Sequence, residues 1–379
     1  MIIAINAINA LAGAGISTLA NLLPKIIEHD KNNKYIVLLS TKQFELRNTI
    51  PSGIQIIEVK YLPVNPYFRV VFEQLILPFY ILFYKVDLLY SMANMTVLFA
   101  PCKIVMTIEN SNPFSKIPIK WSLNNRSKNS LIKFLSWIFV RRVDIIRFVS
   151  NDSLVKISEE LNINPNKCVM ISHGCDFKFS KINQLNKTNN FILTVSAILP
   201  HKNLDRLIKA FAILFDKYNY RGNLVIIGDI LDYSYYKTLL KTASDFSVAG
   251  KVELTGKITY NELSAFYREA DAFVFTSIEE TFGLPLLEAM TAGVPVAASD
   301  CDLNPSLKNK CFNPFKEICG DAIRYFDPFD QNNIAEEVSK ILFNDVLKKE
   351  LIEKGLSRAA LFSWDKTAIS LINVFNKLN

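Results

Sequence analysis

The 379-residue sequence has no apolar run long enough to cross a lipid bilayer, since a spanning helix needs about 20 such residues. Its most apolar window, residues 75–84, is much shorter than that and contains Pro78. No basic segment precedes the apolar start of the chain, so no secretory signal peptide is expected.

Cysteine and histidine are also sparse. The six cysteines include no Cys-x-x-Cys pair, and the three histidines, His29, His173 and His201, are far apart in the sequence. These spacings argue against a zinc site and against a disulfide framework, so we predict no bound metal. Scattered thiols fit a reducing compartment, and we therefore expect a cytoplasmic protein.

Charge is unevenly distributed along the chain. Residues 1–150 hold 17 Lys and Arg against eight Asp and Glu, an excess of nine positive charges, whereas the whole chain carries +7. The segment 116–142 has no acidic residue, and leucines and aromatics alternate with its cations. Read as a basic amphipathic helix, it predicts contact with an anionic lipid surface. The alternative is a helix that packs on its own domain. No nucleic-acid-binding motif is present, so no nucleic-acid partner is expected.

Half of the residues are hydrophobic, which indicates a globular protein, and the length predicts two domains. Short, nearly continuous apolar runs predict buried strands, and segments with helical spacing, such as 15–28, 203–215 and 261–270, lie between them. The predicted strands are residues 1–5, 34–40, 54–59, 86–92, 103–109 and 144–150, then 191–198, 223–229, 251–256, 271–277 and 294–299. This alternation predicts two doubly wound parallel sheets in an α/β fold.

The polar stretch 181–190 lacks periodicity and is the predicted linker. It divides the chain into domains at residues 1–182 and 190–364. In doubly wound sheets, ligands bind at the carboxyl ends of the strands. We therefore expect a cleft between the two sheets to hold the ligand.

Residues 279–290, EETFGLPLLEAM, follow the predicted strand 271–277. Pro285 suits the first position of a helix, with Gly293 just beyond its end. Glu280 is then expected in the loop and Glu288 in the first helical turn. The free N–H groups at this helix start would attract a phosphate, and the carboxylates beside it would accept hydroxyl hydrogen bonds. The pattern predicts a sugar-nucleotide site; the alternative is an acid that only caps its own helix.

The segment SIEETFGLPLLEAMTAGVPVAASD closely resembles the hallmark segment of the family 4 retaining glycosyltransferases, which have the GT-B fold. Further segments match the family in the expected order: ILTVSAILPHKNLDRLIKAF, LVIIGD, VELTGKITYNELSAFYREADAFVFTS, GDAIRYFDP and FSWDKTA. The resemblance covers most of the carboxyl half, and the amino half matches in outline. It implies that the amino domain binds the acceptor and that residues 365–379 pack back on it as a helix.

The resemblance also implies roles for individual residues. Glu288 would hold the ribose hydroxyls, Glu280 would contact the transferred sugar, and Lys202 would neutralise the diphosphate. The backbone of Phe282, Gly283 and Leu284 would approach the donor, and residues near Gly256 and Lys257 would line the base pocket. In the amino half, Gly13 and Gly15 occupy the place of the family's glycine-rich loop, where they would let the backbone approach the donor phosphate or the acceptor.

Two positions depart from the family pattern. Ala197 stands where many members have an arginine, and His201 could supply part of that charge or a hydrogen bond; the alternative is a surface histidine. Glu109 stands where many members have a histidine in the catalytic cleft, and the alternative there is a structural glutamate.

These observations predict a retaining, metal-independent transfer of a hexosyl unit from a GDP- or UDP-sugar to a saccharide acceptor. No cofactor is expected. The basic segment favours a lipid-linked acceptor at the inner face of the cytoplasmic membrane, as in the assembly of O-antigen or capsule polysaccharides. Two alternatives remain: a catalytically silent partner subunit, and a GT-B enzyme of other chemistry, such as a sugar-nucleotide epimerase or a phosphorylase.

Overall fold

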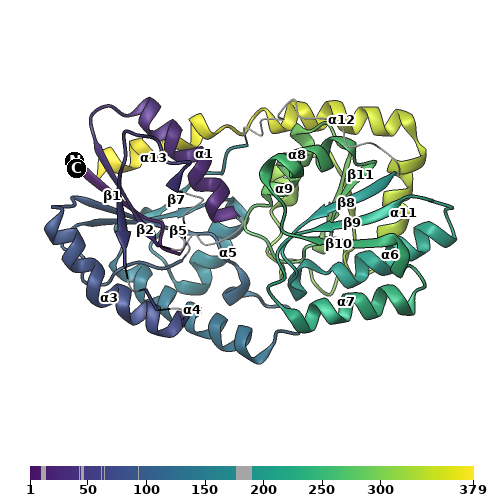
Figure 1. Ribbon diagram of the computed structural model, residues 1–379, viewed down its shortest axis with the longest axis horizontal. Coiled ribbons are helices and arrows are strands. Elements are labelled where there is room, and N and C mark those ends of the chain that lie inside the picture. The colour runs from purple at the N-terminus through teal and green to yellow at the C-terminus, as the bar shows by residue number, and fades with distance from the viewer. Residues whose placement is uncertain are drawn as a thin grey trace. The chain divides into compact units, whose positions relative to one another are not determined.

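The computed structural model describes residues 1–9, 14–41, 43, 47–60, 62–63, 65–92, 94–175 and 190–379 (Figure 1). The chain forms two compact units, each built around its own sheet. The N-terminal unit comprises Met1–Phe114, Ser127–Gly174 and Ser363–Asn379, and the C-terminal unit comprises Ser115–Arg126 and Cys175–Phe362. Most of the predicted linker, residues 181–189, lies outside the described residues.

The sheet of the N-terminal unit has seven parallel strands in the order β3-β2-β1-β4-β5-β6-β7. They are β1 (Ile2–Asn6), β2 (Lys34–Ser40), β3 (Gln55–Val59), β4 (Leu88–Ser91), β5 (Lys103–Ile108), β6 (Ile145–Phe148) and β7 (Cys168–Met170). The central strands are almost completely buried because helices cover both faces, as their continuous apolar runs predict. Only β7 was not predicted, because three residues at a sheet edge leave no periodic signal.

The helices described with this sheet include α1 (Ala14–His29), α3 (Pro66–Phe83), α4 (Leu123–Arg142), α5 (Asn151–Leu161) and α13 (Trp364–Lys377). The last of these packs along α1 on one face. Trp364, Leu371 and Phe375 are buried there among side chains of β1, β2 and β4. The chain end is therefore part of the core of the N-terminal unit, as the family resemblance implies.

The sheet of the C-terminal unit has six parallel strands in the order β10-β9-β8-β11-β12-β13. They are β8 (Phe191–Val195), β9 (Asn223–Ile227), β10 (Val252–Gly256), β11 (Ala272–Phe275), β12 (Val296–Ser299) and β13 (Arg324–Phe326). Strand order reverses between β8 and β11, so the loops that follow these two strands leave the sheet side by side. These loops carry Lys202 and Glu280.

Helices cover both faces of this second sheet (Figure 1). They are α6 (Leu204–Asp216), α7 (Tyr233–Asp245), α8 (Tyr260–Glu269), α9 (Leu284–Thr291), α10 (Phe315–Cys319), α11 (Gln331–Phe343) and α12 (Asp345–Ala359). Apolar side chains of α6, α7 and α11 form one core with β8 and β9. Local signals fix the helix starts: Thr259 and Glu262 form a reciprocal capping box at α8. The two units together show the predicted GT-B architecture of two doubly wound domains.

One segment departs from the expected division of the chain. Residues 115–126, which precede most of α4, belong to the C-terminal unit although they come from the middle of the amino half. The predicted basic helix over 116–142 begins only at Leu123, and the residues before it are not helical. Ile117 is buried against Ile278, Cys301 and Cys311, because alternate residues of this extended arm are apolar.

Within the described residues, none of the helices combines the length and apolar character that crossing a bilayer requires.

We predict that Phe375→Ala lowers the free energy of unfolding by about 3–5 kcal/mol, because it empties a fully buried site against the Tyr90 ring. Chemical denaturation followed by fluorescence measures the loss. Ile369→Ala on the exposed side of the same helix is the matched control, expected to cost less than about 1 kcal/mol. Equal costs for the two variants would contradict the docking of α13.

Candidate functional site

An ion pair joins the two loops at the strand-order reversal of the C-terminal unit. Lys202 Nζ contacts Glu280 Oε1, and both side chains are largely shielded, with 15% and 16% of their surface exposed. Partial burial strengthens such a pair, because less water screens it. The predicted diphosphate-binding lysine and the predicted sugar-binding glutamate therefore stand together at the carboxyl edge of the sheet.

Main-chain hydrogen bonds hold these two loops to each other. Ile278 N donates to His201 O at 2.9 Å, and Thr276 Oγ1 donates to Lys202 O at 2.8 Å. Lys202 ends the short 3-10 turn η3 (Pro200–Lys202), and Asn203 follows in a left-handed conformation, φ 58°. Asn203 is buried and its amide donates to Pro328 O at 2.7 Å. Hydrogen bonds at His201, Lys202 and Asn203 thus hold the backbone on each side of Lys202 in the sequence.

The start of α9 follows directly after Glu280. Gly283 precedes the helix with φ 96°, and a Cβ at this position would lie 3.0 Å from the Phe315 ring. Only glycine fits that conformation and that contact. Leu284 is the first helical residue, so Pro285 takes the second position and not the predicted first. Phe282 and Leu284 are buried, which leaves their backbone, not their side chains, to meet a ligand.

Glu288 is the fifth residue of α9, just past the first turn in which it was predicted, because the helix begins one residue earlier, at Leu284. Its carboxylate accepts a hydrogen bond from Tyr267 Oη at 2.8 Å. Burial raises the pKa of Glu288 from its ordinary 4.5 to about 7, and the Tyr267 hydrogen bond opposes that rise. Tyr267 was not singled out in the sequence, where its place on the helical pattern of residues 261–270 indicates only packing.

His201 is buried, and its ring lies 5.3 Å from the Trp121 ring. Burial, and then the charge of Lys202, hold the pKa of His201 well below its usual range. The histidine is therefore neutral. It does not replace the positive charge of the arginine that many family members have at the position of Ala197. Its Nδ1 is buried, and no hydrogen-bond partner for it exists among the described residues.

The arm of residues 115–126 reaches this site from outside the predicted motifs. Ser115 Oγ donates to Glu279 Oε1 at 2.7 Å, and Asn125 Nδ2 donates to Asp232 Oδ2 at 3.2 Å. Phe312 N donates to the other oxygen of Glu279 at 3.2 Å. Glu279 is thus a structural acid, while its neighbour Glu280 pairs with Lys202. The alternation Ile117-x-Ile119-x-Trp121 is the signal that could have revealed an extended arm.

In the N-terminal unit, Glu109 follows β5 and lies in a buried polar cluster. Its Oε1 is 3.8 Å from His173 Nε2 and 4.0 Å from Arg147 Nη1. Burial raises the pKa of Glu109, and Arg147 opposes the rise. Burial and Arg147 together hold the pKa of His173 well below its usual range. Sequence reasoning missed Arg147 and His173 because their partners are distant in the chain.

Arg147 is fully buried in β6 and organises this cluster. Its guanidinium donates to Ile171 O at 3.0 Å, to Tyr90 Oη at 2.9 Å and to Ser172 O at 3.2 Å. These three acceptors come from β4 and from the segment after β7, so one side chain ties together the carboxyl edge of the sheet. A buried arginine of this kind is tolerated because its donors are satisfied.

The other predicted residues are more dispersed. Gly15 lies in the first turn of α1 and not in a loop, and Gly13 lies outside the described residues. Gly256 ends β10 with φ 73°, and nothing lies within 4 Å of a Cβ built on it. Lys257 follows it and is exposed. Gly256 therefore leaves open space at the end of this strand.

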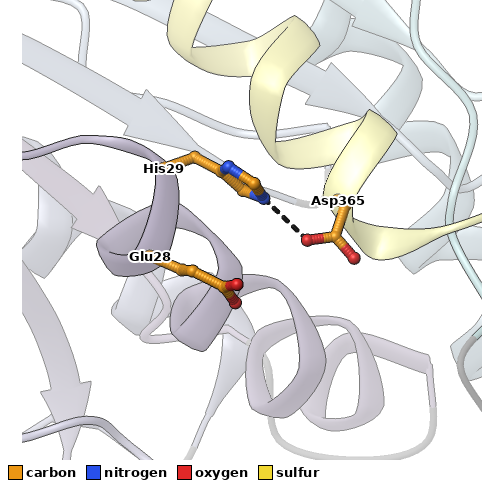
Figure 2. A group of neighbouring side chains, drawn as sticks. All are labelled: Glu28, His29 and Asp365. Atoms are coloured by element: carbon orange, nitrogen blue, oxygen red, sulfur yellow. Dashed lines mark hydrogen bonds and ion pairs between the residues drawn. The ribbon is translucent and has the colours of Figure 1, made fainter.

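A second group of ionisable side chains joins α1 to α13 (Figure 2). His29 Nε2 lies 2.6 Å from Asp365 Oδ1, and among the described residues only these two and Glu28 gather ligand atoms within 4.8 Å. Lys25 Nζ lies 3.1 Å from both Glu28 and Asp365, so an ammonium group already supplies positive charge there. The group links the two helices. Asp365 lies in the first turn of α13, where a negative charge suits the helix dipole, and His29 lies in the last turn of α1.

Comparison with known proteins finds relatives for the C-terminal half of the chain. Residues 176–358 match the family model described as "Glycosyl transferases group 1". The chain is 27% identical over 249 residues to the serotype-specific mannosyltransferase WbdA of Escherichia coli, covering 62% of this chain and 29% of WbdA. It is 28% identical over 209 residues to the O-antigen chain mannosyltransferase RfbU of Salmonella typhimurium, covering 55% and 54% of the two chains. The chain thus spans about a third to half of the length of these relatives.

Solved structures match over the full length. The structure of HepE from Anabaena in complex with UDP-glucose superposes with a TM-score of 0.74 at 17% identity, covering 100% of both chains. At this identity the likeness establishes the fold and no more.

We predict that the Glu288 carboxyl group titrates near pH 7 in the ligand-free protein. Tyr267→Phe removes the hydrogen bond that stabilises the carboxylate and should move the midpoint higher. Because the folded pKa lies above the ordinary 4.5, the stability that Glu288 contributes is complete below about pH 4.5 and declines as pH rises through 7. NMR of glutamate labelled at the carboxyl carbon measures the midpoint, with Tyr236→Phe as control. A midpoint near 4.5 would refute the buried assignment.

We also predict that Arg147→Met lowers the free energy of unfolding by about 3 kcal/mol or more, because it leaves three buried acceptors without their donor. Denaturant titration measures the loss. The exposed Arg126 gives the matched control, and Arg126→Met should change stability by less than about 0.5 kcal/mol. A stable Arg147→Met protein would show that the cluster does not organise the sheet edge.

Proposed function

We propose that the chain is a glycosyltransferase that moves a hexosyl unit from a nucleotide-sugar donor to a saccharide acceptor, because residues 176–358 match the family model described as "Glycosyl transferases group 1". The observation that carries the proposal is the Lys202–Glu280 pair beside the start of α9. A cation and a helix start together suit a diphosphate, and the neighbouring acids suit sugar hydroxyls.

Each group has a proposed task in the transfer. Lys202 and the N–H groups at the start of α9 stabilise the charge that builds on the diphosphate as the bond from the anomeric carbon breaks. Glu280 stabilises the positive charge on the sugar ring, and ionised Glu288 accepts hydrogen bonds from the ribose hydroxyls. The acceptor oxygen bonds to the anomeric carbon, and its proton passes to an oxygen of the leaving phosphate on the same face. This gives retention of configuration.

The reaction is proposed to need neither a metal ion nor a cofactor. Lys202 with the helix start performs the electrostatic task that a divalent cation performs elsewhere. Neutral His201 adds no charge. Lys202 must therefore neutralise more of the diphosphate charge than in a chain that has an arginine at the position of Ala197. Backbone of Phe282 and Gly283 and the open space at Gly256 complete the donor site.

Glu109 is the proposed cleft residue of the N-terminal unit. Burial raises the pKa of its carboxyl group and Arg147 opposes that rise, and Glu109 is proposed to form a hydrogen bond with an acceptor or sugar hydroxyl. Gly13 and Gly15 are proposed to bring the backbone near the donor phosphate or acceptor. These assignments follow the family resemblance and the position of Glu109 at the carboxyl end of β5.

The substrates are proposed from the relatives. WbdA and RfbU are named mannosyltransferases, and RfbU acts on O-antigen chains by its name, which favours mannosyl transfer in surface-polysaccharide assembly. HepE binds UDP-glucose, so a UDP-sugar is the competing donor. The acceptor is proposed to be a lipid-linked oligosaccharide, met at the cytoplasmic face of the membrane.

A donor panel tests the activity. The chain is incubated with GDP-mannose, UDP-glucose or a TDP-sugar and a lipid-linked oligosaccharide acceptor, and release of nucleoside diphosphate is followed. Acceptor-dependent release supports transfer, and configuration at the new linkage tests retention. Donor binding without release would indicate a silent partner subunit. Turnover without acceptor would indicate an epimerase, and dependence on inorganic phosphate a phosphorylase.

We predict that Lys202→Ala and Glu288→Ala each lower kcat/KM at least about tenfold, roughly 1.4 kcal/mol in transition-state stabilisation. Steady-state rates with the preferred donor measure the loss. The matched controls are Lys251→Ala and Glu353→Ala, exposed residues of the same types in the same unit, expected to keep full activity. Near-normal rates in both site variants would overturn the site assignment.

A further inference from the structure

Helix α3 presents an apolar face to solvent. Seven of the 24 exposed large apolar side chains among the described residues lie on this one helix. They are Tyr67, Phe68, Val71, Leu75, Phe79, Leu82 and Phe83. Phe68 and Phe79 have 67% and 68% of their surface exposed, and Phe83 has 78%. Because these positions recur every three or four residues, most form one continuous stripe along the helix.

The polar side chains of α3 are directed away from this stripe. Glu73 is buried and accepts hydrogen bonds from Asn9 Nδ2 at 3.1 and 3.2 Å. Gln74 donates to Thr96 O and accepts from Leu98 N, both at 2.9 Å. A helix on the surface of a water-soluble domain normally has a polar face outward. Helix α3 buries Leu77 and Ile81 in the core and is apolar on its outward face as well, which indicates that the outward face meets an apolar medium.

The same surface continues across a loop to α4. Gln74 of α3 and Arg142 of α4 hold the loop 96–100 from its two sides, because Arg142 donates to Leu98 O at 3.0 Å and to Ala100 O. Phe99, at the centre of this loop, has 81% of its surface exposed. Tyr67 Oη and Ser127 Oγ, 2.8 Å apart, join the beginnings of the two helices.

Helix α4 adds aromatic rings and cations to this surface. Phe134 and Trp137 are exposed with ring centroids 6.4 Å apart, and the Arg141 guanidinium lies 3.9 Å from the Trp137 ring. Lys128 is exposed on the same helix, which contains no acidic residue, and exposed Lys85 follows the end of α3. Aromatic rings beside arginine and lysine are typical of helices that lie in the interface of a bilayer.

We propose that the outward faces of α3 and α4 with Phe99 form a docking surface for an anionic lipid membrane. The stripe of α3 enters the boundary between headgroups and acyl chains, and Lys85, Lys128 and Arg141 meet the anionic headgroups. The proposal deepens the lipid-linked acceptor of the proposed function, since such an acceptor is presented at a membrane. It keeps the α4 part of the predicted lipid contact over 116–142 and leaves out the first residues of that segment, which form the arm of the C-terminal unit.

Charge favours a membrane over a second copy of the chain as the occupant. Two copies that met through this face would bring the same cations toward one another, and like charges across an interface oppose association. The excess of nine positive charges in residues 1–150 attracts an anionic surface instead. Apolar area and cationic charge on one surface together match a bilayer containing acidic lipids.

Co-sedimentation of the full chain with vesicles tests the proposal. Wild type should bind vesicles of phosphatidylcholine mixed with phosphatidylglycerol and bind pure phosphatidylcholine vesicles more weakly. The combined variant Phe68→Gln, Leu75→Gln, Phe79→Gln and Phe83→Gln should bind the mixed vesicles at least about tenfold more weakly. Its residues are exposed, so circular dichroism and the thermal midpoint should stay as in wild type.

Two further variants complete the design. Lys128→Gln with Arg141→Gln should weaken binding to the mixed vesicles by about fivefold per charge and leave binding to pure phosphatidylcholine unchanged. Phe343→Gln with Val346→Gln removes exposed apolar side chains of the C-terminal unit, 58% and 78% exposed, and should change nothing.

Two results would overturn the proposal. One is unchanged vesicle binding in the folded α3 variant, and the other is a wild-type dimer, seen by light scattering, that this variant abolishes while vesicles bind neither protein. The assay contains no donor and no acceptor, so it stands or falls independently of glycosyl transfer. Transfer to a soluble acceptor, measured without vesicles, reports on the proposed function alone.

Discussion

The chemistry of this chain depends on the reversal of strand order between β8 and β11. At this point the connections from the two neighbouring strands run to opposite sides of the sheet. Their loops therefore border a crevice at the carboxyl ends of the strands, where ligands bind in this class of sheet. Here those loops are joined by hydrogen bonds from Ile278 and Thr276 to the backbone beside and at Lys202. One topological constraint therefore positions Lys202, Glu280 and the start of α9 together.

Three neighbouring glutamates acquire different roles from their surroundings alone. Glu279 is buried and binds the arm, Glu280 pairs with Lys202, and Glu288 is partly buried and accepts a hydrogen bond from Tyr267. The sequence pattern could predict the strand, the glycine and the helix around them, because these depend on local propensity and spacing. It could not separate the acids, since their partners Ser115, Lys202 and Tyr267 lie 164, 78 and 21 positions away in the chain.

Long-range contacts explain the other failures of sequence reasoning as well. The neutrality of His201 requires burial under Trp121, and the cluster of Glu109 requires Arg147 and His173, all from separate segments. The arm was interpreted as part of a basic helix because charge composition does not report backbone conformation. Its alternating Ile117, Ile119 and Trp121 were the local signal, and alternation fits an extended segment and not a helix.

The apolar window around Pro78 shows that the spacing of apolar residues does not reveal which side of a helix faces the core. Length alone excluded a bilayer crossing for residues 75–84 and suggested nothing further, since an amphipathic pattern does not state which side faces the core. The partners of Glu73 and Gln74 supply that information: both polar groups are held by Asn9 and the loop 96–100. These contacts, together with the buried side chains of Leu77 and Ile81, fix the rotation of the helix about its axis, so Phe68 and Phe79 face outward. The outward apolar face is thus determined by contacts that are distant in the sequence, and it is the observation on which the proposed lipid contact rests.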